Sequence, residues 1–337
     1  MRGFTNHYNH DGEYALIGRQ GALCGNVNYA VGKSYFTEHA VAVRANKTNQ
    51  TRFLYYLFST MNLGQYSGQS AQPGLAVGNL VELENVVPSK PEQEKIASFL
   101  SSLDHLITLH QRKYDKLQVL KKAMLEKMFP KNGSSVPEIR FKGFTDAWEQ
   151  RKLSEMCGTF EYGLNAAAKE FDGKNKYIRI TDIDDASREF LLSDLSSPDI
   201  CLDGMSKYLL SSGDIVFART GASVGKTYIY RENDGIVYFA GFLIRAKVNQ
   251  DNDAEFVFQS TLSPSYEKYI RITSQRSGQP GVNAQEYGEY DLFAPSKEEQ
   301  QRIGHFLRGI DSLITLHQRE LEKLQNIKKS MLEKMFV

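Results

Sequence analysis

Residues 89–129 read SKPEQEKIASFLSSLDHLITLHQRKYDKLQVLKKAMLEKMF, and residues 296–336 read SKEEQQRIGHFLRGIDSLITLHQRELEKLQNIKKSMLEKMF. With Pro88 and Pro295 placed before them, the two stretches align without a gap at an offset of 207 residues, and 27 of the 42 positions are identical. A repeat of this length indicates a duplicated structural unit rather than a short solenoid period.

Each copy of the repeat predicts one long helix. Ser89 with Glu92, and Ser296 with Glu299, fit the S-x-x-E capping box that satisfies free N–H groups in a first helical turn. Neither Gly nor Pro interrupts the first copy after Glu92. At 1.5 Å per residue, each helix would be roughly 60 Å long.

Apolar residues recur in sevens along both copies, which is the pattern of a narrow coiled-coil seam. We expect the two helices to pair with each other, antiparallel, in one chain; two surface helices packed on separate cores are the alternative. Leu100, Ile107 and Met128 widen the seam and leave apolar surface for a further partner. The predicted interface residues are Ile96, Phe99, Leu103, His110, Leu117 and Met124 in the first helix and Ile303, Phe306, Ile310, His317, Leu324 and Met331 in the second.

One histidine interrupts each seam, His110 in the first helix and His317 in the second. A metal site would need further ligands at suitable spacing, and no Cys or carboxylate supplies them. A polar layer that fixes the register of the helices is the other interpretation. Because His110 lies near the middle of its helix, antiparallel pairing would bring the two rings together.

Length and composition limit the possible functions. A chain of 337 residues can hold two domains, and its formal charge of +1 gives no overall basic excess, so any DNA contact must come from a local patch or a partner protein. Cys24, Cys157 and Cys201 are odd in number and lack C-x-x-C spacing, which favours a reducing compartment and no zinc site. No run approaches the ~20 apolar residues of a membrane span. We therefore expect a cytoplasmic protein with no membrane contact.

The duplication extends beyond the helices. Residues 17–25 (IGRQGALCG) align with 217–225 (FARTGASVG), and Val43-Arg44 aligns with Ile244-Arg245. Mixed strand and helix patterns indicate an α+β fold in which globular domains alternate with the two long helices. Nothing in the first half corresponds to residues 137 to about 206, so the first domain is predicted to be partial. The expected organisation is 1–88, the C-terminal part of a truncated first domain; 89–130, the first helix; 131–136, a linker; 137–294, a complete second domain; and 295–337, the second helix.

The stretch TGASVGKT (residues 220–227) resembles a phosphate-binding loop but has one residue too few between its glycines. A tight turn joining two strands is the better interpretation. Polar and basic groups there and in two other segments suit DNA contact, although solvated loops explain them equally well. The candidate DNA-binding residues are Lys174, Lys176, Arg179, Thr181, Arg219, Thr220, Ser223, Lys226, Arg276, Ser277, Gln279 and Asn283.

The sequence offers no clear catalytic motif. It contains no H-E-x-x-H and lacks the Asn-Pro-Pro-aromatic motif of amino-methyltransferases, and its G-x-S-x-G match, residues 221–225, lies inside the stretch interpreted above as a tight turn. We therefore expect neither catalytic residues nor metal ligands in this chain.

The layout resembles the DNA specificity subunit of Type I restriction–modification systems, through PEIRFKGF followed by Trp148, an R-x-G-x-x-x-G turn, Gln-Pro-Gly, P-x-x-E-Q and LITLHQR. The resemblance implies target recognition domains that each read one half of a bipartite double-stranded DNA site, held apart by two antiparallel helices. It also implies two modification subunits, which methylate adenine with S-adenosylmethionine, and a motor–nuclease subunit that uses ATP and magnesium. The chain itself would bind no cofactor. An alternative is a truncated or silent-cassette protein that binds the modification subunit through its coiled coil without productive DNA recognition.

Overall fold

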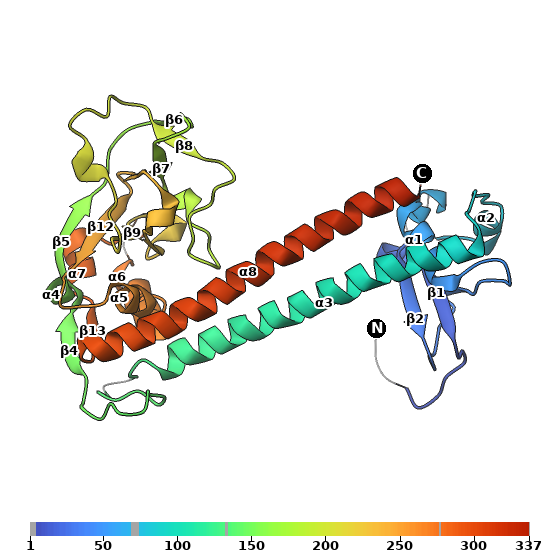
Figure 1. The fold of residues 1–337 in the computed structure, drawn as a ribbon, viewed down its shortest axis with the longest axis horizontal. Coiled ribbons are helices and arrows are strands. Elements are labelled where there is room, and N and C mark those ends of the chain that lie inside the picture. Colours follow the sequence, from blue (N-terminus) through green and yellow to red (C-terminus); the bar gives the residue numbers. More distant parts are fainter. Residues whose placement is uncertain (1–4, 69–73, 132–133, 276–277, 337) are drawn as a thin grey trace. The chain divides into compact units, whose positions relative to one another are not determined.

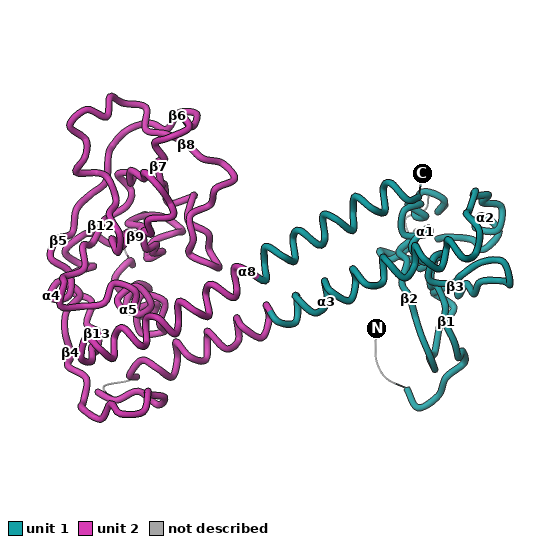
Figure 2. Tube along the Cα trace, viewed as in Figure 1, with its two compact units in different colours: residues 1–113, 317–337 teal, residues 114–316 magenta. Residues whose placement is uncertain are grey.

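The computed structural model describes residues 5–68, 74–131, 134–275 and 278–336. They form two compact units: unit 1 contains Met1–Lys113 with His317–Val337, and unit 2 contains Tyr114–Leu316 (Figure 2). Two long helices, α3 (Lys90–Lys127) and α8 (Lys297–Met335), each contribute to both units (Figure 1). The two long helices predicted from the repeat are therefore confirmed.

Unit 1 is built on a three-stranded antiparallel sheet of order β2-β1-β3. Its elements are β1 (Glu13–Gly18), β2 (Val27–Val31), β3 (Ala40–Val43), α1 (Thr51–Thr60) and α2 (Val77–Val81), with short 3-10 helices η1 (Gly21–Leu23) and η2 (Leu63–Tyr66). The side chain of Gln50 caps α1 by accepting a hydrogen bond from the Phe53 amide. Helix α1 then packs its apolar face on the α3–α8 pair through Tyr56 and Phe53.

Unit 2 contains a four-stranded antiparallel sheet of order β10-β9-β12-β5 and three two-stranded pairs, β7–β11, β4–β13 and β6–β8. Its strands are β4 (Glu149–Lys152), β5 (Cys157–Tyr162), β6 (Ala168–Glu170), β7 (Lys176–Ile178), β8 (Ser196–Pro198), β9 (Ile215–Ala218), β10 (Thr227–Ile229), β11 (Val237–Phe239), β12 (Leu243–Val248) and β13 (Asp291–Ala294). Its helices are α4 (Leu153–Met156), α5 (Ala254–Ser260), α6 (Pro264–Thr273) and α7 (Ala284–Gly288), with 3-10 helices η3 (Ile180–Asp182), η4 (Ser206–Tyr208), η5 (Gly221–Ser223) and η6 (Glu232–Asp234).

The main core of unit 2 joins the sheet to the long helices. Phe217 of β9 and Ile244 of β12 are fully buried with Phe256 of α5, and the same cluster contains Leu125 of α3 and Ile303 of α8. The buried strands are short and continuous in apolar residues because both of their faces are covered. This packing fixes the end of β9, from which the candidate site begins.

The two long helices pack antiparallel in each unit. In unit 1, Phe336 of α8 contacts the cluster of Phe53 and Ala97, whereas His317 lies against His110, so the two helices run in opposite directions. An ion pair joins Asp104 to Lys328 in unit 1, and its counterpart at an offset of 207 residues joins Lys121 to Asp311 in unit 2. The duplicated sequence therefore makes the same contact in each unit.

One of the two repeating seam positions differs from the prediction. The residue four positions after Ile303 is buried, whereas the prediction chose the residue three positions after it. The buried seam residues on α8 include Ile303, Leu307, Ile310, Ile314 and Leu321, which follow one another in steps of four, three, four and seven residues. Of the other predicted interface residues, Leu103 is buried and Ile96, Leu117, Met124, Leu324 and Met331 are partly buried in the clusters that line the helices.

Phe99 and Phe306 correct the prediction. Phe99 is 43% exposed, and Phe306 is 37% exposed with its ring against Phe141. Both lie three residues after a seam position, about 60° short of a full helical turn, whereas the residue four positions on lies about 40° beyond it, so the two fall on opposite sides of the preceding seam residue. Leu100 and Leu307 occupy that fourth position and are fully buried.

His110 and His317 meet as predicted, with 3.2 Å between their Nδ1 atoms and 5.1 Å between ring centroids. Burial, the His110 ring and Lys113 all lower the pKa of His317. At this distance one ring donates a hydrogen bond through Nδ1 and the other accepts it. In the described part of the chain, no three His, Cys, Asp or Glu side chains are grouped to hold a metal ion.

Candidate nucleic-acid interface

The glycine-rich stretch of unit 2 forms a tight turn between β9 and β10. Ala218 donates from its amide to the Lys226 carbonyl (2.8 Å), and Gly225 donates to the Ala218 carbonyl (2.9 Å). Gly225 has a φ of 83°, and a Cβ there would lie 2.5 Å from Ile270, so only glycine fits. The turn joins two antiparallel strands and does not lead into a long helix, which confirms that this is not a phosphate-binding loop of the usual kind.

A second predicted segment packs directly against this turn. Gly221 donates to the Pro280 carbonyl (3.0 Å), and Val282 donates to the Arg219 carbonyl (2.9 Å). The buried Tyr287 closes the arrangement, because its hydroxyl donates to Ala218 (2.7 Å) and accepts from Gly225. Two of the three segments selected from the sequence, 219–226 and the described part of 271–283, therefore form one site.

Among the described residues, the surface of this site carries one cation, one amide and two aromatic rings. The Arg219 guanidinium lies over the Tyr162 ring at 5.1 Å, and Tyr162 is 45% exposed. Phe242, which accepts a hydrogen bond from the Arg219 amide through its carbonyl, is 59% exposed. Gln279 is also exposed, with its amide nitrogen next to Gly221. We name this surface the turn patch: Tyr162, Arg219, Thr220, Phe242 and Gln279.

Sequence reasoning missed Tyr162 and Phe242. Phe242 stands in the apolar run IVYFAGFLIRAKV, where it looks like an interior strand residue, and only the Gly241 before it signals a bend. Tyr162 likewise precedes a glycine at the end of β5. In both places the sequence offered one signal, an aromatic residue next to a glycine.

Lys226 corrects the prediction of a phosphate contact. Its side chain is buried, with Nζ donating to the Ile183 carbonyl (3.0 Å) and pairing with Asp185 at 2.5 Å. An ammonium group already bound inside the protein is not free to reach DNA. Ser223 stays partly exposed in η5, where its carbonyl accepts from the Lys226 amide.

The third segment, Lys174 to Asp182, mostly makes contacts within the protein. Arg179 makes two 2.8 Å hydrogen bonds to Asp182, and Lys176 donates to the Asp234 carbonyl (2.6 Å). Thr181 is exposed and its hydroxyl donates to Asp182, while Lys174 is exposed. Arg179 and Lys176 are thus poor candidates for direct contact with DNA.

Asn283 has a local structural role. Its side-chain oxygen accepts from the Glu286 amide (2.9 Å), and its own amide donates to the Glu286 carboxylate, so it caps α7. Arg276 and Ser277 lie outside the described residues. Thr220 forms an isolated bridge with Gly281, which leaves its side chain partly exposed.

Unit 1 contains the same turn. Gly18 donates to Asn26 (2.9 Å), Gly25 donates to Gly18 (2.9 Å), and Leu75 donates to the Arg19 carbonyl (2.8 Å). These bonds repeat the three bonds made in unit 2 by Ala218, Gly225 and Val282. At the surface of this turn, the Gln20 and His39 side chains are hydrogen-bonded at 2.8 Å.

The strand register corrects the alignment of Val43-Arg44 with Ile244-Arg245. Val41 lies opposite Ile17 in unit 1, as Ile244 lies opposite Phe217 in unit 2, so the true counterpart of Arg245 is Ala42. Alternating valines made a shift of two residues invisible in the sequence.

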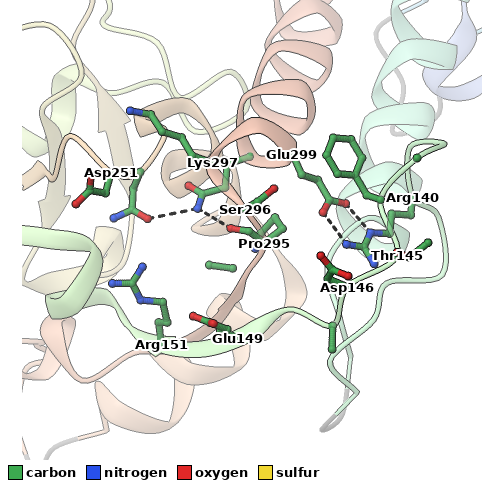
Figure 3. Close-up of a pocket in the computed structure, with 16 residues that line it drawn as sticks. Arg140, Thr145, Asp146, Glu149, Arg151, Asp251, Pro295, Ser296, Lys297 and Glu299 are labelled. Carbon is green, nitrogen blue, oxygen red and sulfur yellow. Dashed lines mark hydrogen bonds and ion pairs between the residues drawn. The ribbon is translucent and has the colours of Figure 1, made fainter.

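The structure offers little for catalysis. Burial raises the pKa of the Cys157 thiol to about 12, which keeps it protonated at neutral pH. A polar cleft of about 410 Å³ lies at the start of α8, and its Arg140 and Glu299 make two 2.7 Å hydrogen bonds to each other (Figure 3). Within residues 5–336, apart from the three gaps, no helix has the length and apolar character needed to cross a membrane.

Comparison with known proteins gives concordant matches. The family described as "Type I restriction modification DNA specificity domain" matches residues 2–119 and 145–326. The Type I restriction enzyme EcoprrI specificity subunit of Escherichia coli is 49% identical over 106 residues, which are 32% of this chain and 26% of that protein. The MjaVIII specificity subunit of Methanocaldococcus jannaschii is 24% identical over 306 residues, 86% of this chain and 71% of that protein.

A solved structure has the same fold. The Type I restriction–modification S subunit from M. genitalium aligns with a TM-score of 0.69 at 18% identity and covers 100% of this chain and 86% of its own.

Proposed function

Since this chain belongs to the Type I restriction–modification DNA specificity family, we propose that it selects the DNA sequence on which a Type I complex acts. The observation that carries the proposal is the turn patch of unit 2. It gathers a guanidinium, a primary amide and two aromatic rings around a partly exposed glycine turn. Catalysis belongs to partner subunits, because a specificity subunit contributes recognition and not chemistry.

The patch has the groups that DNA recognition needs. An arginine can bind a phosphate or donate two N–H groups to guanine, and a glutamine can bond adenine at two points, donating to N7 and accepting from the N6 amino group. The Tyr162 ring lies 5.1 Å from the Arg219 guanidinium, and this cation–π contact restricts the arginine side chain, which favours such two-point contacts. The turn itself is braced from below by Tyr287, so both side chains start from a fixed backbone.

The helices supply a surface for the partners. Phe99, Leu106 and Leu109 are exposed on α3 in unit 1, and their repeat counterparts Phe306, Leu313 and Leu316 are exposed on α8 in unit 2. Exposed apolar stripes of this kind mark interaction sites. Because the stripe occurs twice, it supports two copies of one partner, the adenine-methylating modification subunit, which uses S-adenosylmethionine.

The larger assembly follows from the same proposal. A motor–nuclease subunit that uses ATP and magnesium would join the complex, and the chain itself would hold no cofactor. Because the complex would act on double-stranded DNA, we place the chain in the cytoplasm.

A second candidate function is supported by unit 1. No described residue pairs with the outer edge of β3, whereas β5 covers the corresponding edge of β12 in unit 2. If this edge of β3 stays unpaired in the assembled complex and unit 1 binds no half-site, the chain would bind the modification subunit without recognising a bipartite site, as a truncated or silent-cassette protein would.

DNA binding by the complex reconstituted with modification subunits tests the proposal. A base-reading contact by Gln279 is worth roughly 1–3 kcal/mol, so Gln279→Ala should weaken binding to the target about 5- to 100-fold and spare non-specific DNA. If Arg219 contacts phosphate, Arg219→Ala should weaken binding to all sequences and reduce the salt slope by about one. Lys247→Ala, at the exposed far end of β12, is the matched control and should change neither. The patch is wrongly assigned if all three variants bind alike.

A further inference from the structure

Helix α6 holds the glycine turn of unit 2 with its inner face. Tyr266 and Ile270 are buried on that face. The Tyr266 hydroxyl donates to the Gly225 carbonyl (3.1 Å), and the Ile270 side chain fills the space beside Gly225 that a Cβ would need. The turn that carries Arg219 is therefore packed directly on α6.

The C-terminal end of α6 lies beside the turn patch. The Gly281 amide donates to the Ser274 carbonyl (3.3 Å) directly after the helix, and Gly281 also forms the isolated bridge with Thr220. Backbones linked in this way lie about 5 Å apart, so Ser274 lies on the order of 10 Å from Thr220. The major groove of B-DNA is about 12 Å wide, so one groove can take up side chains from both places.

The outer face of α6 carries a stripe of exposed side chains at helical spacing. Positions i, i+3, i+4 and i+7 lie on one side of a helix. The residues there, which we name the α6 stripe, are Lys268, Arg271, Ile272 and Gln275. Ile272 is 61% exposed, and no described residue forms an ion pair or a side-chain hydrogen bond with Lys268 or Arg271. The acidic residue of this helix, Glu267, lies in the first turn, at the end away from the turn patch.

We propose that the α6 stripe enters the major groove beside the turn patch, and that Ile272 reads a thymine through its 5-methyl group. The major groove admits an α-helix, and α6, with 10 residues, is about 15 Å long. Apolar side chains distinguish thymine by contact with this methyl group. Arg271 and Lys268 would bind phosphates at the edge of the groove, and Gln275 would bond a neighbouring base. This inference rests on the proposed function, because it extends the same DNA contact.

The composition of the stripe favours DNA over a protein partner. The apolar side chains that we assign to the modification subunit form a repeated stripe on α3 and α8. Ile272, in contrast, is a single apolar residue among two cations and an amide. One isoleucine is too small an apolar area to mark a protein-docking site, whereas it matches the size of a thymine methyl group.

Replacing thymine by uracil removes the methyl group alone and tests the contact. The probe is a duplex containing the motif read from the methylome of the wild-type complex, titrated at fixed salt against the chain assembled with modification subunits. Each thymine of the motif and its flanks is replaced in turn by deoxyuridine. One replacement should weaken binding to the wild-type complex about four-fold, the value of one buried methyl group. With Ile272→Ala, the unmodified duplex should bind at least about four-fold more weakly, and the same replacement should have no further effect.

Two further variants serve as controls. Ile200→Ala makes the same change at an exposed isoleucine just after β8, well away from α6, and should leave binding of both duplexes unchanged (Figure 1). Arg271→Ala should weaken binding to all sequences and reduce the salt slope by about one. Ile272→Ala removes only an exposed side chain, so its thermal midpoint should match that of the wild type.

The inference is overturned if no thymine replacement depends on Ile272, or if Ile272→Ala weakens assembly with the modification subunit instead of DNA binding. Gln279→Ala separates this outcome from failure of the proposed function. A motif that Gln279→Ala relaxes, with no uracil effect that depends on Ile272, refutes the helix contact alone. A complex that methylates no specific motif refutes both.

Discussion

Gln93 and Gln300 should each hold one globular part of the chain to its long helix. The side chain of Gln93 accepts from the Gln50 amide (3.0 Å) and donates to the Pro88 carbonyl (2.9 Å) and to Asn49 (3.0 Å). Gln300 makes the same three bonds, accepting from the Asp253 amide (3.0 Å) and donating to the Pro295 carbonyl (2.9 Å) and to Asn252 (3.3 Å). Both side chains are almost fully buried, with 1% and 2% exposed.

Methionine at either position keeps the volume and removes all three bonds. Two partly buried backbone groups then lose their partners, and each unsatisfied group costs about 1–3 kcal/mol. We therefore expect Gln93→Met to lower the free energy of unfolding of unit 1 by roughly 2–4 kcal/mol. Gln300→Met should lower that of unit 2 by the same amount.

Hydrogen exchange resolved along the sequence is the suitable assay, since a chain of two units need not unfold in one step. Gln301→Met is the control, because it makes the same change at the exposed neighbouring position. Effects below about 1 kcal/mol, or equal to the control, would refute the reasoning.

Three further predictions concern single contacts. The pKa of His317 is lowered in the folded state, so its neutral ring contributes stability at pH values above ~6.5. This stability falls as pH drops through the folded pKa. His317→Asn should therefore flatten that part of the pH profile of stability measured by urea denaturation. Lys226→Met should destabilise unit 2 by about 1–3 kcal/mol, because the Ile183 carbonyl loses its donor, yet leave DNA affinity per folded molecule unchanged. A double-mutant cycle on Lys121 and Asp311 should give a coupling of about 0.5–3 kcal/mol in thermal denaturation; additive effects would contradict the contact.

The two long helices and their pairing could be predicted from the sequence because several independent patterns indicate them. A gap-free repeat gave the length of both helices, and the positions of His110 and His317 gave the antiparallel pairing that the structure shows. The seam was less well determined. Phe99 and Leu100 are adjacent and both apolar, and only the buried contacts of Leu100 reveal which of the two faces the partner helix.

The site was only partly predictable because burial is not a local property. Lys226 follows a glycine turn and looks solvent-exposed in the sequence, but the Ile183 carbonyl and Asp185 come from a segment about 40 residues earlier. Arg179 similarly pairs with Asp182 once η3 forms. Arg219 stays partly exposed and Gln279 stays exposed, and no pattern of composition distinguishes these two side chains from the buried Lys226.

Methylome sequencing of cells that express this chain with its modification subunit tests the central claim most directly. The account predicts adenine methylation at one sequence motif that depends on the chain, and Gln279→Ala should relax that motif at one position while Lys247→Ala leaves it unchanged. A stable complex without motif-specific methylation, or a motif unaltered by changes throughout the turn patch, would contradict it.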